Sequence, residues 1–189
     1  GRDDILSARL FRGTKTFVSD DVWAALDPIV KYHRELAKKG DILSDLERRV
    51  LERVKNENSI RTDRLRKRLG LGSKENNYKF HRALVNLEKY LLIVGVEDPV
   101  PEKHLHANIW QTWQDRTRKR TGKASLTYRE ALAELVKKTL DSCVLAREDQ
   151  IGRWFHWHAD VGAIVQELLR KEAILKAGSY LLTSRISAS

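Results

Sequence analysis

Basic side chains crowd the segment RTDRLRKR, residues 61–68, in which five of eight positions are arginine or lysine. On a helix, Arg61, Arg64 and Arg68 would lie opposite the apolar positions of the same segment. Guanidinium groups bind phosphate oxygens through paired hydrogen bonds, so the expected chemistry is the anchoring of a polyanion backbone. An ordinary solvated helix face is the competing interpretation.

A second basic run, RTRKRTGK at 116–123, is expected either to follow a phosphate strand or to serve as a solvated tether. Each neutralised phosphate adds nearly one unit to the salt dependence of binding, so both runs together would supply most of a nonspecific affinity. The predicted phosphate contacts are Arg61, Arg64, Lys67, Arg68, Arg116, Arg118, Lys119 and Arg120.

Amide and cationic side chains follow the first run, on a helix expected to begin at Ser73. Asparagine pairs bidentately with adenine, and lysine or arginine pairs with guanine. Simple solvation is the competing interpretation. Tyr78 is expected to be a half-buried core residue or to contact a sugar. The predicted base contacts are Lys74, Asn76, Asn77, Lys79 and Arg82.

Two His-x-His pairs raise the question of a metal site: His104 with His106, and His156 with His158 ahead of Asp160. Such pairs could meet at a metal ion, but solvated or capping histidines are the preferred interpretation. The chain also lacks a phosphate-binding loop of the P-loop type and a nucleophile-elbow phrase around any serine. We therefore predict no metal, no cofactor and no catalytic residue.

The elements that would position these residues begin with a hairpin over 8–19 that turns at Gly13. A helix then starts at Ser19 or Asp20, with a kink or break at Pro28 and a stop at Gly40.

The next unit has three helices and a hairpin. Its first helix starts with a Ser44–Glu47 capping box, its second is capped by Thr62 and ends at Gly70, and its third runs from Ser73 to Lys89. A strand in LLIVGVEDP and a return strand in HANIWQTWQDR follow. This order is typical of a winged helix, whose third helix enters a major groove.

A second unit has the same plan. We expect helices over 126–143, 147–157 and 158–173, and then a hairpin that turns at Gly178. Residues 126–189 carry nine lysines and arginines against eight acidic residues, so this unit is nearly neutral. It suits packing or partner contact better than contact with DNA.

Composition limits the class of protein. The 189 residues are 41% hydrophobic and 33% charged, as in a globular chain, and no apolar run is long enough to cross a bilayer. The net charge is +10; subtracting the last 64 residues (36−9 basic, 26−8 acidic) leaves +9 on residues 1–125. The single cysteine, Cys143, is expected to be buried in a reducing compartment, and the location is expected to be cytoplasmic and nucleoid-associated. Because methionine is absent, we expect the chain to begin inside a longer gene product.

Several local phrases resemble a known family. ARLFRGTKTFVS, RALVNLEKYLLIVG, ALAELVKKTL and DQIGRWFHW, in this order, are similar to the winged-helix superfamily of AlkZ/YcaQ-type crosslink-repair DNA glycosylases, especially AlkZ-related proteins of unassigned activity. The resemblance implies tandem winged helices, DNA as the ligand, and repair or regulation as the setting. The glycosylases use a Gln-apolar-Gln or Gln-apolar-Asp motif.

The chain departs from this motif. Its nearest residues, Gln111, Gln114 and Asp115, have the wrong spacing and lie on a predicted strand, so polar positions alternating with Trp110 and Trp113 are the preferred interpretation. Flipping a base out of a duplex also needs a pocket and catalytic groups that the sequence does not reveal. The departure puts catalysis in doubt but leaves DNA binding open.

We therefore predict a mainly α (α+β) protein of tandem winged helix-turn-helix domains with small β-hairpins. The expected parts are a hairpin-and-helix appendage (1–43), a DNA-binding domain (44–116), a basic linker (117–125) and a second domain (126–189). The expected function is duplex DNA binding, as a transcription regulator or a noncatalytic repair-family relative. The alternatives are a DNA glycosylase for alkylated or crosslinked DNA and a protein-interaction scaffold. A protein partner or a homodimer through the second domain is expected, and no membrane partner.

Overall fold

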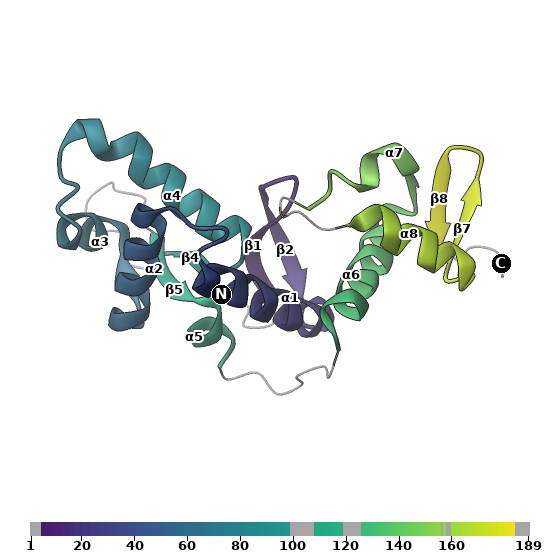
Figure 1. Ribbon diagram of the computed structural model, residues 1–189, viewed down its shortest axis with the longest axis horizontal. Helices are drawn as coiled ribbons and strands as arrows, with labels where there is room; N and C mark the ends of the chain where they lie inside the picture. The colour runs from purple at the N-terminus through teal and green to yellow at the C-terminus, as the bar shows by residue number, and fades with distance from the viewer. Residues whose placement is uncertain (1–4, 99–107, 119–125, 156, 158–159, 184–189) are drawn as a thin grey trace.

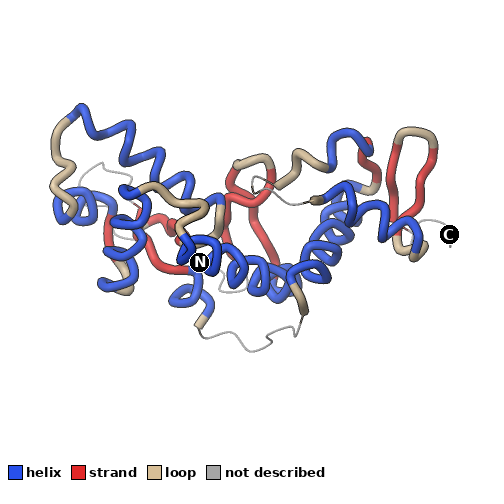
Figure 2. The backbone as a smooth tube through the Cα atoms, viewed as in Figure 1, coloured by secondary structure: helices blue, strands red, loops and turns tan. Residues whose placement is uncertain are grey.

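The computed structural model describes residues 5–98, 108–118, 126–155, 157 and 160–183. The described chain is mostly helical, and its strands form three small antiparallel sheets (Figure 1). Figure 2 shows these strands as separate short groups placed between helices. The expectation of a largely helical chain with small β-hairpins is therefore confirmed.

The N-terminal hairpin pairs β1 (Ile5–Phe11) with β2 (Thr14–Ser19), as predicted. Arg12 and Gly13 at its turn both have positive φ, 49° and 69°, which is the backbone geometry that matches the twist of a two-residue hairpin. The turn is fixed further by a hydrogen bond from Arg12 N to Trp154 O at 2.8 Å.

Helix α1 (Asp20–Lys39) follows and ends at Gly40, whose φ of 86° suits the predicted stop. The helix continues through Pro28, so the predicted break is wrong. Leu26 and Ile29, on either side of the proline, are fully buried. Their burial outweighs the loss of one backbone hydrogen bond.

The next unit contains α2 (Asp45–Glu57), α3 (Thr62–Arg68), the short 3-10 helix η1 (Lys74–Asn76) and α4 (Asn77–Lys89). Its sheet has the order β3-β5-β4, with β3 (Ile60–Arg61), β4 (Ile93–Glu97) and β5 (Asn108–Thr112). The predicted three helices and the two later strands are present. The strand β3 was not predicted, because two residues are too short to show a hydrophobic period.

The helix starts of this unit were only partly predicted. The Ser44–Glu47 capping box is present, with Ser44 N donating to Glu47 Oε2 at 2.7 Å. Thr62 does not cap α3, because its hydroxyl donates to Asn108 O at 3.0 Å and accepts from Trp110 Nε1 at 2.8 Å. Ser73 precedes η1 rather than an α-helix, and its hydroxyl accepts from Asn76 Nδ2 at 2.9 Å.

The return strand is shorter than predicted. It ends at Thr112, and Trp113–Thr117 form the helix α5, capped by a hydrogen bond from Asp115 N to Thr112 Oγ1 at 3.2 Å. Trp110 and Trp113 are both buried, at 4% and 2% exposed. Residues three apart on one strand would point to opposite faces, so the chain turns to bury both indoles.

The last unit contains α6 (Tyr128–Cys143), β6 (Leu145–Arg147), α7 (Glu148–Ile151), α8 (Val161–Arg170), β7 (Ile174–Ala177) and β8 (Tyr180–Thr183). The first helix and the turn at Gly178, with φ of 60°, agree with prediction. The second helix is a single turn, because it ends at Ile151 and the described residues from Gly152 to Trp157 are not helical. The strand β6 just before it was not predicted. Cys143 is exposed at the end of α6, so its predicted burial is wrong.

Two hydrophobic cores hold these elements. One lies under α2, α3 and α4, around Val50, Leu65 and Phe80. The other joins the N-terminal hairpin and α1 to α6 and α8, for example through Leu26 and Leu132. Figure 1 places the hairpin and α1 between the two ends of the molecule. Residues 5–43 thus form part of a shared core, and the division into an appendage and two domains remains a prediction.

At Gly95 in β4, the side chains of Trp110 and Glu88 pack directly against the backbone. A Cβ atom there would lie 2.8 Å from Trp110 Cζ3 and 3.3 Å from Glu88 Oε1. We expect Gly95→Ala to lower the free energy of unfolding by about 1–3 kcal/mol, because the ring and the carboxylate are both confined. Urea denaturation would measure the change. The control is Gly162→Ala in α8, where the nearest atom is 3.7 Å away and unfolding should be unchanged or slightly harder. Equal stability of both variants would contradict the expectation.

Candidate nucleic-acid interface

Helix α3 presents the first basic run. Leu65 is fully buried and Leu69, just beyond the helix end, is 9% exposed, so the helix is anchored by its apolar side. Its last turn holds three cations next to the helix carboxyl end, where positive charge is stabilised. Gly70, with φ of 70°, then ends the helix, as predicted.

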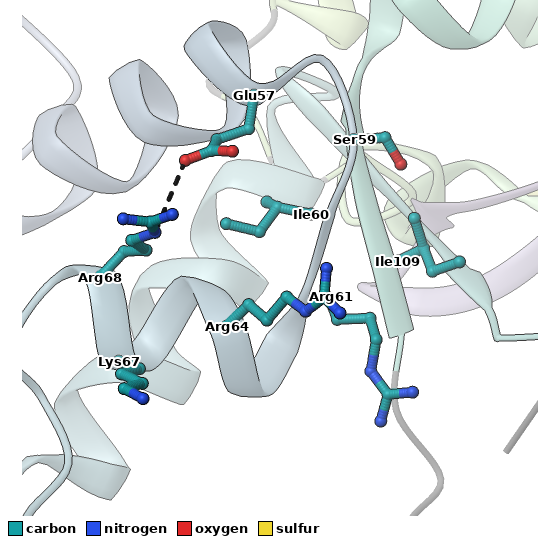
Figure 3. Close-up of a pocket in the computed structure, with 8 residues that line it drawn as sticks. All are labelled: Glu57, Ser59, Ile60, Arg61, Arg64, Lys67, Arg68 and Ile109. Carbon is teal, nitrogen blue, oxygen red and sulfur yellow. Dashed lines mark ion pairs between the residues drawn. The ribbon is translucent and has the colours of Figure 1, made fainter. Parts of the chain in front are cut away.

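The structure brings four predicted phosphate contacts to one hollow of about 840 Å³. The hollow is called the α3 hollow below; it is lined by Glu57, Ser59, Ile60, Arg61, Arg64, Lys67, Arg68 and Ile109 (Figure 3). These residues come from the end of α2, from β3, from α3 and from β5. Among the described residues its lining holds four cations and one carboxylate, and the carboxylates of Asp63 and Asp98 just outside it pair with Arg61.

Arg61 differs from its neighbours in the α3 hollow. Its side chain is 15% exposed, and its guanidinium forms ion pairs with Asp98 at 2.8 Å and with Asp63 at 3.1 Å. Asp98 is itself only 9% exposed. Binding of a phosphate would compete with a partly buried ion pair, so Arg61 is better suited to holding β3 beside the end of β4.

The side chains of Arg64 and Lys67 are exposed and form no ion pair or hydrogen bond with any residue that the structure describes. Arg68 is 66% exposed and lies 3.9 Å from Glu57, which also pairs with Arg53 at 3.7 Å. Figure 3 shows Arg68 directed toward Glu57 and Lys67 extending away from it. Arg64 and Lys67 are therefore the cations of this hollow that are available to an external anion.

Arg66 has a structural role that the sequence did not suggest. Its guanidinium donates to Leu71 O and to Ser73 O, both at 2.7 Å, across the turn between α3 and η1. Because one planar guanidinium group bonds two carbonyls, it fixes the turn between the residues predicted to contact phosphates and those predicted to contact bases. Arg66 lies between Arg64 and Lys67 in the sequence, and nothing in the sequence shows that its role differs from theirs.

The predicted base contacts lie on η1 and on the first half of α4. Lys74, Asn77, Lys79 and Arg82 are exposed, whereas Asn76 is half-buried and donates to Ser73. The other side of α4 is anchored in the core by Phe80 and Leu84. Tyr78 is 74% exposed, so its interpretation as a half-buried core residue is wrong.

The second basic run is described only in part. Arg116 on α5 is half-buried, and its Nε has no partner among the described residues. Arg118 is 71% exposed and paired with Asp115. Lys119 and Arg120 lie outside the described residues. None of the described members of this run lines the α3 hollow.

The glutamines near the return strand are divided between two elements. Gln111 lies on β5, whereas Gln114 and Asp115 lie on α5, which corrects their predicted placement on one strand. Asp115 accepts from the Thr112 hydroxyl at 2.6 Å. With its amide oriented to accept, Gln114 Oε1 lies 2.6 Å from Arg34 Nη1. These polar groups are thus engaged in local contacts.

No group of three or more His, Cys, Asp or Glu side chains within the described ranges is arranged to hold a metal ion. His104, His106, His156 and His158 fall outside those ranges, so the structure does not describe either pair. In the described part of the chain, every helix is too short or too polar to cross a membrane.

The fold and the site together define a mostly helical protein with a basic hollow in the unit that runs from α2 to β5. Residues 1–156 match the model of the family described as AlkZ related, and the chain belongs to this family. The resemblance to AlkZ-related proteins is thereby confirmed, whereas the winged-helix superfamily stays a prediction. No curated protein and no solved structure matches the chain.

Proposed function

We propose that the chain binds duplex DNA through residues 44–116, as a transcription regulator or as a noncatalytic relative of a DNA-repair family. The observation that carries this proposal is the exposed, unpartnered pair of cations in the α3 hollow, Arg64 and Lys67. Membership of the AlkZ-related family supports a DNA-repair setting.

The order of elements from α2 to β5 supports a winged-helix reading of this unit. In such a unit the third helix lies in the major groove and the preceding helix and turn contact phosphates. Here α4 would carry the base contacts, and Arg64 and Lys67, aided by Arg68, would bind the backbone. Arg61 is left out of the phosphate set because of its ion pair with Asp98. The last unit, with its similar order of elements, would be the second winged helix.

The double variant Arg64→Ala/Lys67→Ala tests this proposal. Each phosphate contact contributes about 0.9 to the salt slope, so the variant should lose about two units of slope and bind roughly 50-fold more weakly at 0.1 M salt. Fluorescence anisotropy of a labelled duplex, titrated at several salt concentrations, measures both quantities. The loss should be similar for duplexes of unrelated sequence, because phosphates carry no sequence information.

The matched control is Arg153→Ala/Arg170→Ala, which removes two exposed cations from the last unit. It changes net charge equally and should keep most of the affinity. Equal losses in both double variants would show a diffuse charge effect and contradict a site at α3. Arg61→Ala is unsuitable as a probe, because loss of its ion pair with Asp98 would also disturb folding.

Family membership also favours a second candidate, a DNA glycosylase acting on alkylated or crosslinked DNA. Against it, the polar groups nearest to the expected motif, Gln114 and Asp115, are used in contacts with Arg34 and Thr112. Abasic sites formed in alkylated DNA under single-turnover conditions would establish this alternative. Binding without such sites would favour the noncatalytic reading.

A further inference from the structure

A second basic hollow lies between α1, α2 and α5 and has a volume of about 1030 Å³. It is called the α2 groove below. Its lining includes eight lysines and arginines but only two acidic residues, Glu52 and Asp115. Six of the cations come from the first two helices: Arg34, Lys38, Arg48, Arg49, Arg53 and Lys55.

The α2 groove lies on the side of α2 that faces away from α4. The residues of α2 that are buried are Glu47, Val50 and Val54, and Glu47 Oε1 accepts from Asn86 Nδ2 of α4 at 2.8 Å. Arg48, Glu52 and Lys55 follow a different line along the helix and remain exposed. A duplex held by the exposed face of α4 would therefore leave the α2 groove open.

Carboxylates just outside the lining neutralise part of this charge. Lys38 pairs with Glu35, Arg48 with Asp45 and Arg53 with Glu57. Counting these three acids, eight cations face five anions, so a net charge of +3 remains. The Lys55 side chain forms no ion pair or hydrogen bond with a described residue. Arg34 contacts the neutral amide of Gln114. Together with the hydrogen bond from Lys38, the charge of Arg34 also helps to lower the pKa of Glu35.

The nature of the lining favours a particular polyanion. Among the described residues it contains no aromatic side chain, whereas sites for single-stranded nucleic acid use aromatic rings to stack bases. Its leucines offer little to an amphipathic peptide, because Leu43, Leu69 and Leu92 are each at most 9% exposed. The fourth leucine of the lining, Leu51, is half-buried against the core. Guanidinium and ammonium groups on three helices suit the phosphates of a duplex, whose bases stay stacked inside.

We propose that the α2 groove binds the phosphate backbone of a second duplex segment, in addition to the segment bound at α3 and α4. The proposal rests on the proposed function for the first segment only. The chain would then hold one duplex segment at α3 and α4 and another in the α2 groove, and the two segments would approach each other at Arg68, which lines both hollows. The groove would supply sequence-independent affinity to either end of a bent duplex or to a neighbouring one.

The test compares the native chain with the variant Arg34→Glu/Lys55→Glu and with Arg64→Ala/Lys67→Ala. Short labelled duplexes are titrated to measure the number bound per chain, with sedimentation to confirm that one chain is present in each complex. The native chain should bind two duplexes and capture a fluorescent duplex on beads that carry another. Each double variant should bind one and lose the capture. Reversal of the two charges should weaken the second site by at least about 50-fold at 0.1 M salt.

The outcomes separate the two proposals. One duplex bound by the native chain, with affinity unchanged by Arg34→Glu/Lys55→Glu, overturns the groove and leaves the proposed function intact. The native chain could instead bind a single duplex, and this binding could be lost in Arg34→Glu/Lys55→Glu but kept in Arg64→Ala/Lys67→Ala. That result would support binding in the groove and overturn the proposed site at α3. Binding of polyglutamate by the groove in preference to duplex would identify an acidic protein as the ligand and overturn the proposal.

Discussion

Arg9→Met is expected to lower the free energy of unfolding by about 3–5 kcal/mol, because it leaves a buried carboxylate without its partner. Arg9 Nε donates to Glu88 Oε2 at 2.7 Å, and the Glu88 side chain is only 4% exposed. This ion pair joins β1 to α4, and therefore ties the N-terminal hairpin to the helix that bears the proposed base contacts. Urea denaturation followed by circular dichroism measures the loss.

A second variant separates the lost pair from damage to packing. In Arg9→Met/Glu88→Leu both charges are replaced by apolar groups, so most of the stability should return. The control is Arg129→Met, which removes an ion pair of the same 2.7 Å length with Glu167 at a position where the arginine is 57% exposed. Its effect should be much smaller, because solvent screens exposed pairs. A double variant as unstable as Arg9→Met alone would refute this account.

Below neutral pH, the chain is expected to lose about 3 kcal/mol of stability through His33 alone. Burial lowers the pKa of His33 from 6.5 to about 4, against the opposing effect of its contact with the carbonyl of Tyr90. His33 is 1% exposed, and Nδ1 lies 2.9 Å from Tyr90 O. The rings of Tyr90 and Trp157 lie within 5.4 Å and 5.2 Å of the imidazole.

The sign follows from proton binding. Between about pH 6.5 and pH 4 the unfolded chain holds a proton on this imidazole and the folded chain does not. The contribution of His33 is therefore complete above pH 6.5 and is lost progressively as the pH falls toward 4. Unfolding free energies measured across this range would show the slope.

His33→Asn should flatten this pH dependence, since the amide can donate to Tyr90 O but does not titrate. The variant is expected to be less stable at neutral pH because it is smaller than the imidazole. The matched control is His81→Asn, at an exposed position on α4, which removes a histidine without touching this core. Identical pH profiles for the native chain and His33→Asn would rule out the assignment.

Local signals in the sequence predicted much of the secondary structure. The Ser44–Glu47 capping box and the helix stops at Gly40 and Gly70 depend on residues close in sequence, and the structure confirms them. The errors arose where distant residues decide. Burial of Trp113 against α1, with its Nε1 donating to Asp27 at 2.6 Å, turns the expected strand into α5.

The same limit applies to the candidate site. Arg61 and Arg64 are the same residue type at helical spacing, but Arg61 lies on β3 and pairs with Asp63 and with Asp98, which is 37 residues away. The α2 groove was not foreseen, because its cations come from different elements whose approach to one another depends on tertiary packing. Counting charges located the basic part of the chain, but it could not show which cations form ion pairs or hydrogen bonds within the fold. The spacing of Trp110 and Trp113 was one signal that could have revealed α5.

Arg66 adds positive charge to the basic run, and its two hydrogen bonds to carbonyls also fix the conformation of the α3–η1 turn. A lysine at this position would keep the positive charge but could not span Leu71 O and Ser73 O with the same planar fork. An exchange of arginine for lysine would thus alter the path of the α3–η1 turn while long-range attraction to a polyanion stayed the same. In the proposed complex, encounter with the polyanion and correct positioning on it would therefore depend on different atoms of one short helix.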